Sequence, residues 1–62
     1  MTKIIKFKNG HSVELLISTT TNEVAAEIWY DIEGRMHRNQ GLPAVIAIED
    51  DYALYYIHGK LQ

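Results

Sequence analysis

The chain has 62 residues and a formal net charge of −2, and 47% of its residues are hydrophobic. This length allows one domain, and the apolar fraction is too high for a disordered tail. Since cysteine is absent, disulfides and thiolate zinc sites are excluded, and a reducing, cytoplasmic location is expected. The chain also lacks a long apolar run, so we expect neither a signal peptide nor a contact with membranes.

Residues 3–7 alternate charged and apolar side chains, and Asn9-Gly10 then marks a hairpin turn. A two-residue loop would mix apolar and polar side chains on both faces. A three-residue loop with a left-handed Gly10 pairs Lys3 with Leu15, Ile5 with Val13 and Phe7 with His11. This register gathers five apolar side chains on one face: Ile5, Phe7, Val13, Leu15 and Ile17. Because a one-residue slip moves every side chain to the other face, we predict the three-residue, bulged hairpin.

The polar segment 18–22 predicts a loop, and the next segment has two readings. Thr20 followed by Glu23 fits a capping box, which favours a short helix near residues 21–28. Against this, residues 24–31 alternate at the period of a strand and include the strand formers Ile28, Trp29 and Tyr30. We predict a strand and keep the helix as the alternative.

Glu33-Gly34 repeats the turn signal of Asn9-Gly10. The same loop geometry would place Asp31 opposite Arg35 and Tyr30 opposite Met36, which are favourable cross-strand pairs.

The segment 39–43 is a second break, closed by a proline that cannot donate to a strand ladder. Residues 44–48 form the most hydrophobic run and predict a central strand covered on both sides. A turn at 49–51 and a strand over 52–57 follow. We predict a third bulged glycine turn at His58-Gly59.

These elements predict an all-β fold, an antiparallel meander of five to six strands built from glycine-turn hairpins over residues 1–62. The alternative is an α+β fold with the short helix named above. Because so small a sheet has open edges and a thin core, we expect a homo-oligomer, most simply a symmetric dimer that pairs edges or buries aromatic side chains.

Residues 52–62 repeat the pattern of residues 27–37. Three positions are identical: Tyr55 with Tyr30, Ile57 with Ile32, and Gly59 with Gly34. Gly10 precedes Gly34 by a similar interval, so a period of about 25 residues with one hairpin per unit is indicated.

Within residues 27–62, the order aromatic, turn glycine, His37-Arg38, then Gly41-Leu42-Pro43-Ala44 resembles a hairpin repeat of phage, viral and bacterial proteins. The pattern is also distantly similar to repeats of the MORN kind. Gln62 stands where a second copy would carry histidine. The resemblance implies a fold style and a phage origin, and it implies no chemistry.

His37 and Arg38 are the first candidate contact residues. Displayed on a loop, Arg38 could form a forked pair with a carboxylate or phosphate. The alternative is that both side chains tie their loop to backbone carbonyls.

Further candidates are aromatic or basic. Trp29 and Tyr30 must point to opposite faces of a strand, as must Tyr55 and Tyr56. If Tyr30 and Tyr55 belong to the core, Trp29 and Tyr56 lie on the other face. The complete set of expected partner-binding residues is Trp29, Arg35, His37, Arg38, Tyr52 and Tyr56.

Catalytic and metal sites have little support. His11, His37 and His58 fall near three different turns without the short spacing of metal ligands, so no metal or other cofactor is expected. Asp31 and His37 could sit near one another across a hairpin, but a small sheet offers little concavity for catalysis. We expect no enzyme.

The favoured function is a small, phage-encoded binding protein that occludes and modulates, most simply inhibits, a host or partner protein. One alternative is a nucleic-acid-binding accessory protein that uses lysines and exposed aromatic side chains. Another is a structural repeat module of a larger assembly.

Overall fold

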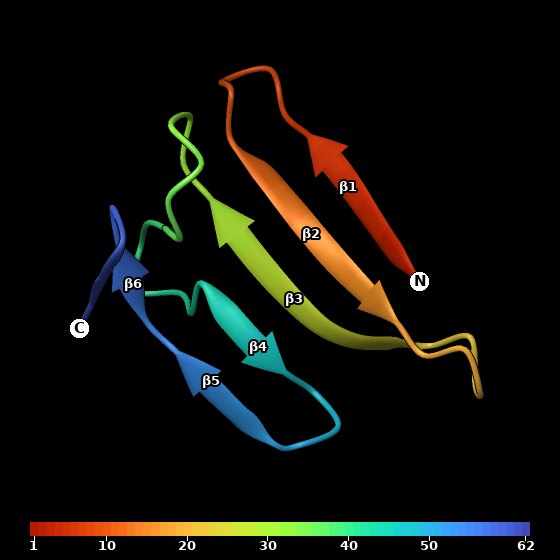
Figure 1. Cartoon of the computed structure of the whole chain (residues 1–62). Helices are drawn as coiled ribbons and strands as arrows, with labels where there is room; N and C mark the ends of the chain where they lie inside the picture. The colour runs from red at the N-terminus through yellow and green to blue at the C-terminus, as the bar shows by residue number, and fades with distance from the viewer.

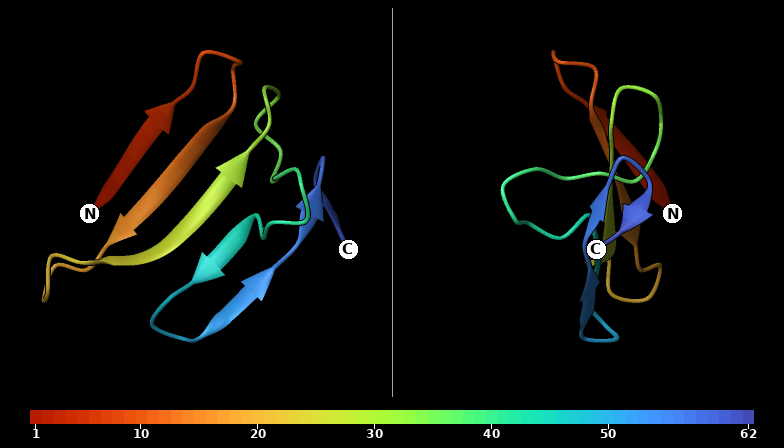
Figure 2. Two further views of the ribbon diagram at one scale, coloured as in Figure 1. Left: turned by 180° about the vertical axis from the view of Figure 1, so that it is seen from behind. Right: turned by 90° about the vertical axis from the view of Figure 1, so that its left-hand side faces the viewer.

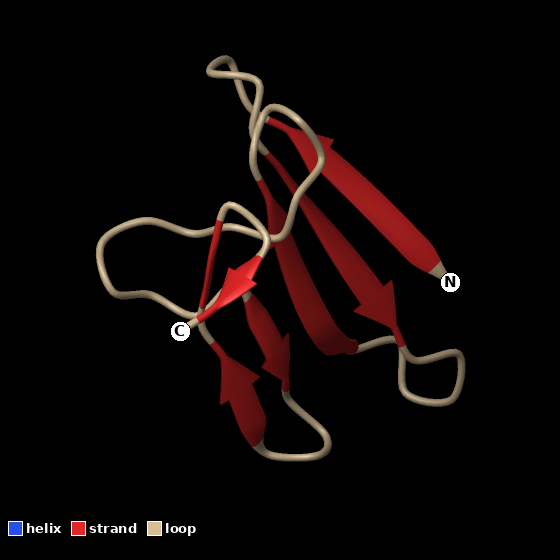
Figure 3. Ribbon diagram, turned by 60° about the vertical axis from the view of Figure 1, so that its left-hand side comes forward, coloured by secondary structure: helices blue, strands red, loops and turns tan.

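The computed structural model describes residues 1–62 and contains strands and turns but no helix (Figures 1 and 3). The seven strands are β1 (Thr2–Lys6), β2 (Ser12–Ile17), β3 (Val24–Tyr30), β4 (Val45–Ala47), β5 (Tyr52–Leu54), β6 (Tyr56–Ile57) and β7 (Lys60–Leu61). The predicted all-β fold is therefore confirmed. No helix has the length and apolarity required to cross a bilayer.

Strands β1 to β5 form one antiparallel sheet in the order β1-β2-β3-β4-β5, and β6 and β7 form a separate two-stranded ribbon. Figure 2 shows the sheet from behind and nearly edge-on, with no second layer of secondary structure across either face. The chain thus builds the predicted meander, in which each strand pairs with its neighbour in sequence.

The first hairpin has the predicted register. Lys3 lies opposite Leu15 and Ile5 opposite Val13, and the amide of Phe7 donates to the carbonyl of His11 at 2.9 Å. Gly10 has a φ of 88°, in the left-handed region that its position in the three-residue loop requires. Segregation of apolar side chains therefore selected the correct loop length.

Segment 18–22 folds as a polar turn, and β3 begins at Val24 as a strand. The hydroxyl of Ser18 accepts the amides of Thr20 and Thr21 at 3.2 and 3.4 Å, and the hydroxyl of Thr21 accepts the amide of Glu23 at 3.3 Å. These bonds serve the turn, so the capping box does not form and the helical alternative is wrong.

The hairpin after β3 also has the predicted pairing. The amide of Asp31 donates to the carbonyl of Arg35 at 2.8 Å, and Tyr30 pairs with Met36. Residues 36–38 then run between β3 and β6, since His37 donates to the carbonyl of Trp29 at 2.9 Å and Arg38 to that of Tyr56 at 3.2 Å.

The apolar run 44–48 differs from the prediction. Only Val45–Ala47 is strand, and β4 does lie between two others, but no layer covers it on both sides. Ala44 is fully buried, whereas Ile48 is 50% exposed. The run was apolar enough for a doubly covered strand, but 62 residues supply no second layer to cover it.

The third glycine turn is also not the predicted bulge. Ile57 pairs directly with Lys60, so the loop has two residues, with φ values of 46° at His58 and 84° at Gly59. Both central residues of a type I′ turn take positive φ, which identifies this turn type. Tyr55, expected in the core, is 45% exposed, while Tyr56 is half-buried.

Directly opposed residues share a face, so the register defines the two faces of the sheet. We call the side that carries Val13, Trp29 and Ile46 the Trp29 face, and the side that carries Ile28, Val45 and Leu54 the Ile28 face. Loop 39–43 projects to one side in the edge-on view (Figure 2, right). Arg38, directly before this loop, lies over the ring of Trp29, so the loop leaves the sheet on the Trp29 face.

Candidate functional site

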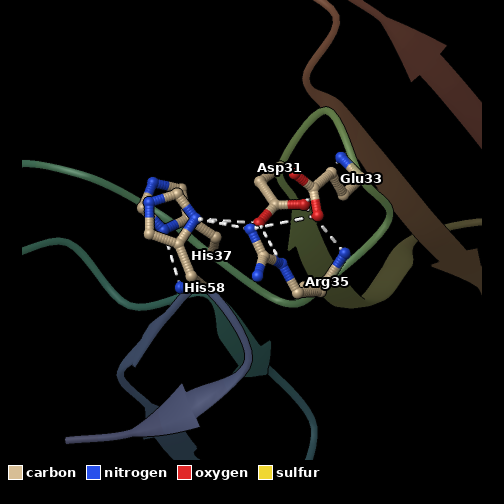
Figure 4. Close-up of polar contacts among 5 residues, drawn as sticks. All are labelled: Asp31, Glu33, Arg35, His37 and His58. Atoms are coloured by element: carbon tan, nitrogen blue, oxygen red, sulfur yellow. Dashed lines mark hydrogen bonds and ion pairs between the residues drawn. The ribbon is translucent and has the colours of Figure 1, made fainter.

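A buried carboxylate lies at the end of the sheet where the glycine turns gather. The side chain of Asp31 is 1% exposed. Its Oδ1 accepts the backbone amides of Glu33 and Arg35, both at 2.9 Å. Its Oδ2 accepts the Nε of Arg35 and the Nδ1 of His58, again at 2.9 Å (Figure 4). Four donors thus converge on one carboxyl group.

These contacts set the ionisation of Asp31. Burial would raise the pKa of its carboxyl group, but hydrogen bonds from His58, Arg35 and the Glu33 amide outweigh burial and lower the pKa well below its usual range. Asp31 is therefore an anion across the physiological pH range. An anionic carboxylate only accepts, so the Nδ1 of His58 must carry a proton.

His37 links this carboxylate to the interior. His37 is only 3% exposed, and its Nδ1 accepts a hydrogen bond from the backbone amide of His58 at 2.9 Å. A neutral His37 therefore carries its proton on Nε2. The rings of His37 and His58 stack at 4.0 Å, and the His11 ring meets His37 edge-on at 5.7 Å.

We call Asp31, Arg35, His37 and His58 the turn cluster. It joins the hairpin after β3 to the β6–β7 ribbon, and each inward nitrogen or oxygen already has a partner within the chain (Figure 4). No group of three or more His, Cys, Asp or Glu side chains is arranged to hold a metal ion. The arrangement suits a structural clamp: its polar atoms are used to hold two turns together.

The pairing within the cluster differs from the sequence expectation. The carboxylate of Asp31 meets the ring of His58, not that of His37. The histidines that seemed dispersed over three turns are in ring contact. Because Asp31 and His58 lie 27 residues apart, only the stacking of neighbouring turns brings them together.

A second site lies on the Trp29 face. The guanidinium carbon of Arg38 sits 3.9 Å from the centre of the Trp29 ring, within the range of a cation–π contact. Phe7 stacks parallel to the same ring with a centroid distance of 5.7 Å and an interplanar angle of 4°. The Trp29 Nε1 donates to the Glu27 carboxylate at 3.1 Å, which restricts rotation of the indole.

Arg38 also ties its own loop, as the structural interpretation of this residue predicts. Its terminal NH1 donates to the carbonyl of Pro43 at 3.4 Å. All ion pairs of the chain involve Asp31 or Glu33, so no carboxylate lies within 4.0 Å of the Arg38 guanidinium. Arg38 is thus an immobilised cation without an anionic partner.

Two depressions flank Arg38, and together with it they form what we call the Arg38 surface. One has a volume of about 370 Å³ and lies between loop 39–43 and the β6–β7 ribbon, with Leu42, Tyr55, Tyr56 and Ile57 among its walls. The other has a volume of about 360 Å³ and is bounded by Phe7, Trp29, Asn39 and Gln40 among others. Arg38 and Leu42 belong to both, so they form the ridge between them.

The structure brings only part of the expected contact set together. Trp29, Arg38 and Tyr56 meet at the Arg38 surface. Tyr52 is 51% exposed but lies on β5, on the Ile28 face. The Arg35 side chain is 46% exposed and belongs to the turn cluster. His37 is almost fully buried and offers its side chain to other residues of the chain rather than to a partner.

Sequence reasoning missed Leu42 and Ile57 as surface residues, with exposed fractions of 43% and 38%. Leu42 had a usable signal, because it is the single apolar residue inside an otherwise polar break. Ile57 had none, since it sits in a run that reads as a strand.

No protein-family model, no curated protein and no solved structure matches this chain, so the site is interpreted from its geometry alone.

Proposed function

We propose that this chain is a small binding protein, of phage origin and acting in the cytoplasm, that covers a functional surface of a host protein and inhibits it. Its activity is binding, without catalysis. The observation that carries the proposal is the Arg38 surface: a cation held on Trp29, without an anionic partner, between a mainly apolar depression and one with a mixed lining.

The state of Arg38 supports a partner that brings a carboxylate. Stacking on Trp29 and the bond to Pro43 already restrict the side chain, so little rotamer freedom remains to be lost on binding. One NH1 bond leaves most of the five guanidinium donors free for a bidentate carboxylate. Arginine, tyrosine and tryptophan are also the residues that most often dominate protein interfaces.

The walls of the mainly apolar depression support an apolar side chain on the partner. Leu42, Tyr55 and Ile57 are all more than one-third exposed and line one side of Arg38. A partner segment with an acidic residue beside an apolar residue fits Arg38 and this depression.

A nucleic-acid partner is less well supported. Lys3 pairs with Leu15 and Lys6 with Ser12, so the two lysines of β1 point to opposite faces and form no continuous basic track with Arg38.

The test is affinity capture from host lysate followed by titration of the captured protein. Arg38→Glu should raise the dissociation constant by about 30-fold or more, equivalent to about 2 kcal/mol, because the variant presents an anion to the partner carboxylate. Leu42→Asp should weaken binding similarly. Lys3→Glu makes the same charge change at a position that lines neither depression and lies outside the Ile28 face, so it should leave the affinity within about twofold.

Capture of material that nuclease removes, or that is lost steeply with added salt, would instead favour the nucleic-acid reading. Equal binding by Arg38→Glu and the unsubstituted chain would exclude the Arg38 surface as the contact.

A further inference from the structure

The Ile28 face is a continuous apolar surface that the proposed function does not use. Two rows of opposed residues cross all five strands of the sheet on this side. One row is Ile4, Glu14, Ile28, Val45 and Leu54, and the other is Thr2, Leu16, Ala26, Ala47 and Tyr52. Eight of these ten side chains are apolar or aromatic.

The residues at the margins of this face are strongly exposed. Ile4 on one edge strand is 59% exposed, Tyr52 on the other is 51% exposed, and Leu16 between them is 36% exposed. Ile28 and Val45, in the middle of their row, and Leu54, at its end on β5, are half-buried. Exposed apolar area that spans a whole sheet marks a surface that another molecule covers.

The polar groups of the Ile28 face are few, and the central pair is internally satisfied. The hydroxyl of Tyr30 donates to the Glu14 carboxylate at 2.9 Å. Burial, reinforced by the bond to Glu14 and its charge, raises the pKa of Tyr30, so its hydroxyl keeps the donated proton. Lys6 and Ser12 lie at one end of the Ile28 face, beyond the two rows, whereas the Trp29 face carries Lys3, Glu27 and Arg38.

We propose that the Ile28 face binds the Ile28 face of a second copy of this chain, giving a two-layered sandwich with two-fold symmetry. The Cα atoms of the whole chain span 32 × 24 × 15 Å, so a broad face of this molecule has room for an interface on the order of the roughly 800 Å² that each partner contributes in standard complexes. Two twisted sheets pack about 10 Å apart through such faces.

A second copy supplies what the monomer lacks. Only Val13, Ala44 and Ala47 are buried hydrophobic residues, and no large side chain is fully buried. Small domains without disulfides or metals gain their stability from association, and a symmetric pair covers both exposed faces at once. The dimer leaves both Arg38 surfaces facing outward, so it presents two copies of the proposed partner site.

Matched aspartate substitutions on the two edge strands, β1 and β5, test which face of the sheet is buried in the dimer. Ile4→Asp and Tyr52→Asp place a charge on the Ile28 face, whereas Lys3→Asp and Ala53→Asp place it on neighbouring, exposed positions of the Trp29 face. Sedimentation equilibrium should show a dimer for the unsubstituted chain and both control variants. Either Ile28-face variant should weaken dimerisation by about 100-fold or more, because a charge enters an apolar interface.

Glu14→Gln adds a test of opposite sign that does not depend on a disruptive variant. The amide oxygen still accepts the Tyr30 hydroxyl, but the interface no longer buries a carboxylate, so dimerisation should tighten by about tenfold. A monomer at millimolar concentration overturns the proposal. So does a dimer that tolerates both Ile28-face aspartates, which would indicate edge pairing, or an unchanged affinity in Glu14→Gln. None of these measurements depends on the partner of the Arg38 surface, so the two proposals fail separately.

Discussion

At the scale of single residues, the turn cluster shows what short-range pattern reading can and cannot find. The pair Asp31 and Arg35 was predictable, because the hairpin register places them opposite each other. The bond from His58 to Asp31 was not, since it depends on a type I′ turn that the sequence pattern did not indicate. Arg38 was correctly placed on a loop, but its position over Trp29 depends on the path of residues 36–38 between β3 and β6.

Asp31 should make stability depend on pH in the acid range. A carboxyl group whose pKa is lower in the folded state stabilises the fold fully above its unfolded pKa of about 3.9. That stabilisation is lost as the pH falls from about 4 through the lower folded-state value. Urea unfolding at several pH values should therefore show a steeper decline for the unsubstituted chain than for Asp31→Asn.

The asparagine variant should also be less stable at neutral pH, because its amide group turns a donor towards Arg35 and His58, which are donors themselves. Glu33→Gln is the matched control, since the Glu33 side chain is 68% exposed and bonds Arg35 only at 3.5 Å. If Asp31→Asn and the unsubstituted chain declined in parallel below pH 4, the turn cluster would not be the source of acid sensitivity.

At the scale of elements, the first hairpin was predictable because its strands have a clear period of two, and the second because the same loop geometry applied to its turn signal. In the first hairpin, only one loop length segregates apolar from polar side chains, and the structure adopts it. The third hairpin lacked this constraint: β6 and β7 have two residues each, too few for alternation to choose a register. The turn-glycine signal alone marked its position and not its type.

The glycine turns should differ in their tolerance of alanine. Gly10 and Gly34 both have positive φ, at 88° and 82°, so alanine should cost about 1–2 kcal/mol at either position. At Gly10 the added Cβ would lie 2.6 Å from the Ile32 side chain, whereas at Gly34 it would meet nothing within 4 Å. Gly10→Ala should therefore lower the urea midpoint further than Gly34→Ala.

Ile32 is 70% exposed, so its removal should itself cost little. In an Ile32→Ala background, which removes the two contacts at 2.6 Å and leaves the one at 3.3 Å, the difference between the two alanine variants should shrink. If the loss of stability caused by Gly10→Ala is unchanged in this background, there is no steric contact between the first turn and the second.

At the scale of the whole molecule, the sequence indicated a thin core, and the structure has one five-stranded sheet with two broad faces beside a two-stranded ribbon. The prediction of a doubly covered strand at 44–48 failed at this scale. The hydrophobicity of a segment indicates that its side chains are buried, but it does not indicate whether the same chain or another chain buries them.

Thermal unfolding should depend on protein concentration. If folding is coupled to the proposed dimer, each tenfold increase in concentration should raise the unfolding midpoint by about 5 °C, given about 0.7 kcal/mol of unfolding enthalpy per residue. Tyr52→Asp should flatten this dependence and Ala53→Asp should preserve it. A midpoint that stays constant over two decades of concentration would indicate a self-sufficient monomer.

The placement of Trp29 gives the molecule its own optical probe. It is the only tryptophan in the chain, and its indole lies against both the Phe7 ring and the Arg38 guanidinium. Its emission therefore reports on one location without any label. A ligand that moves Arg38 away from the indole ring should change the intensity and wavelength of the Trp29 fluorescence. Binding can therefore be followed by intrinsic fluorescence, at nanomolar to micromolar concentrations of the unlabelled protein.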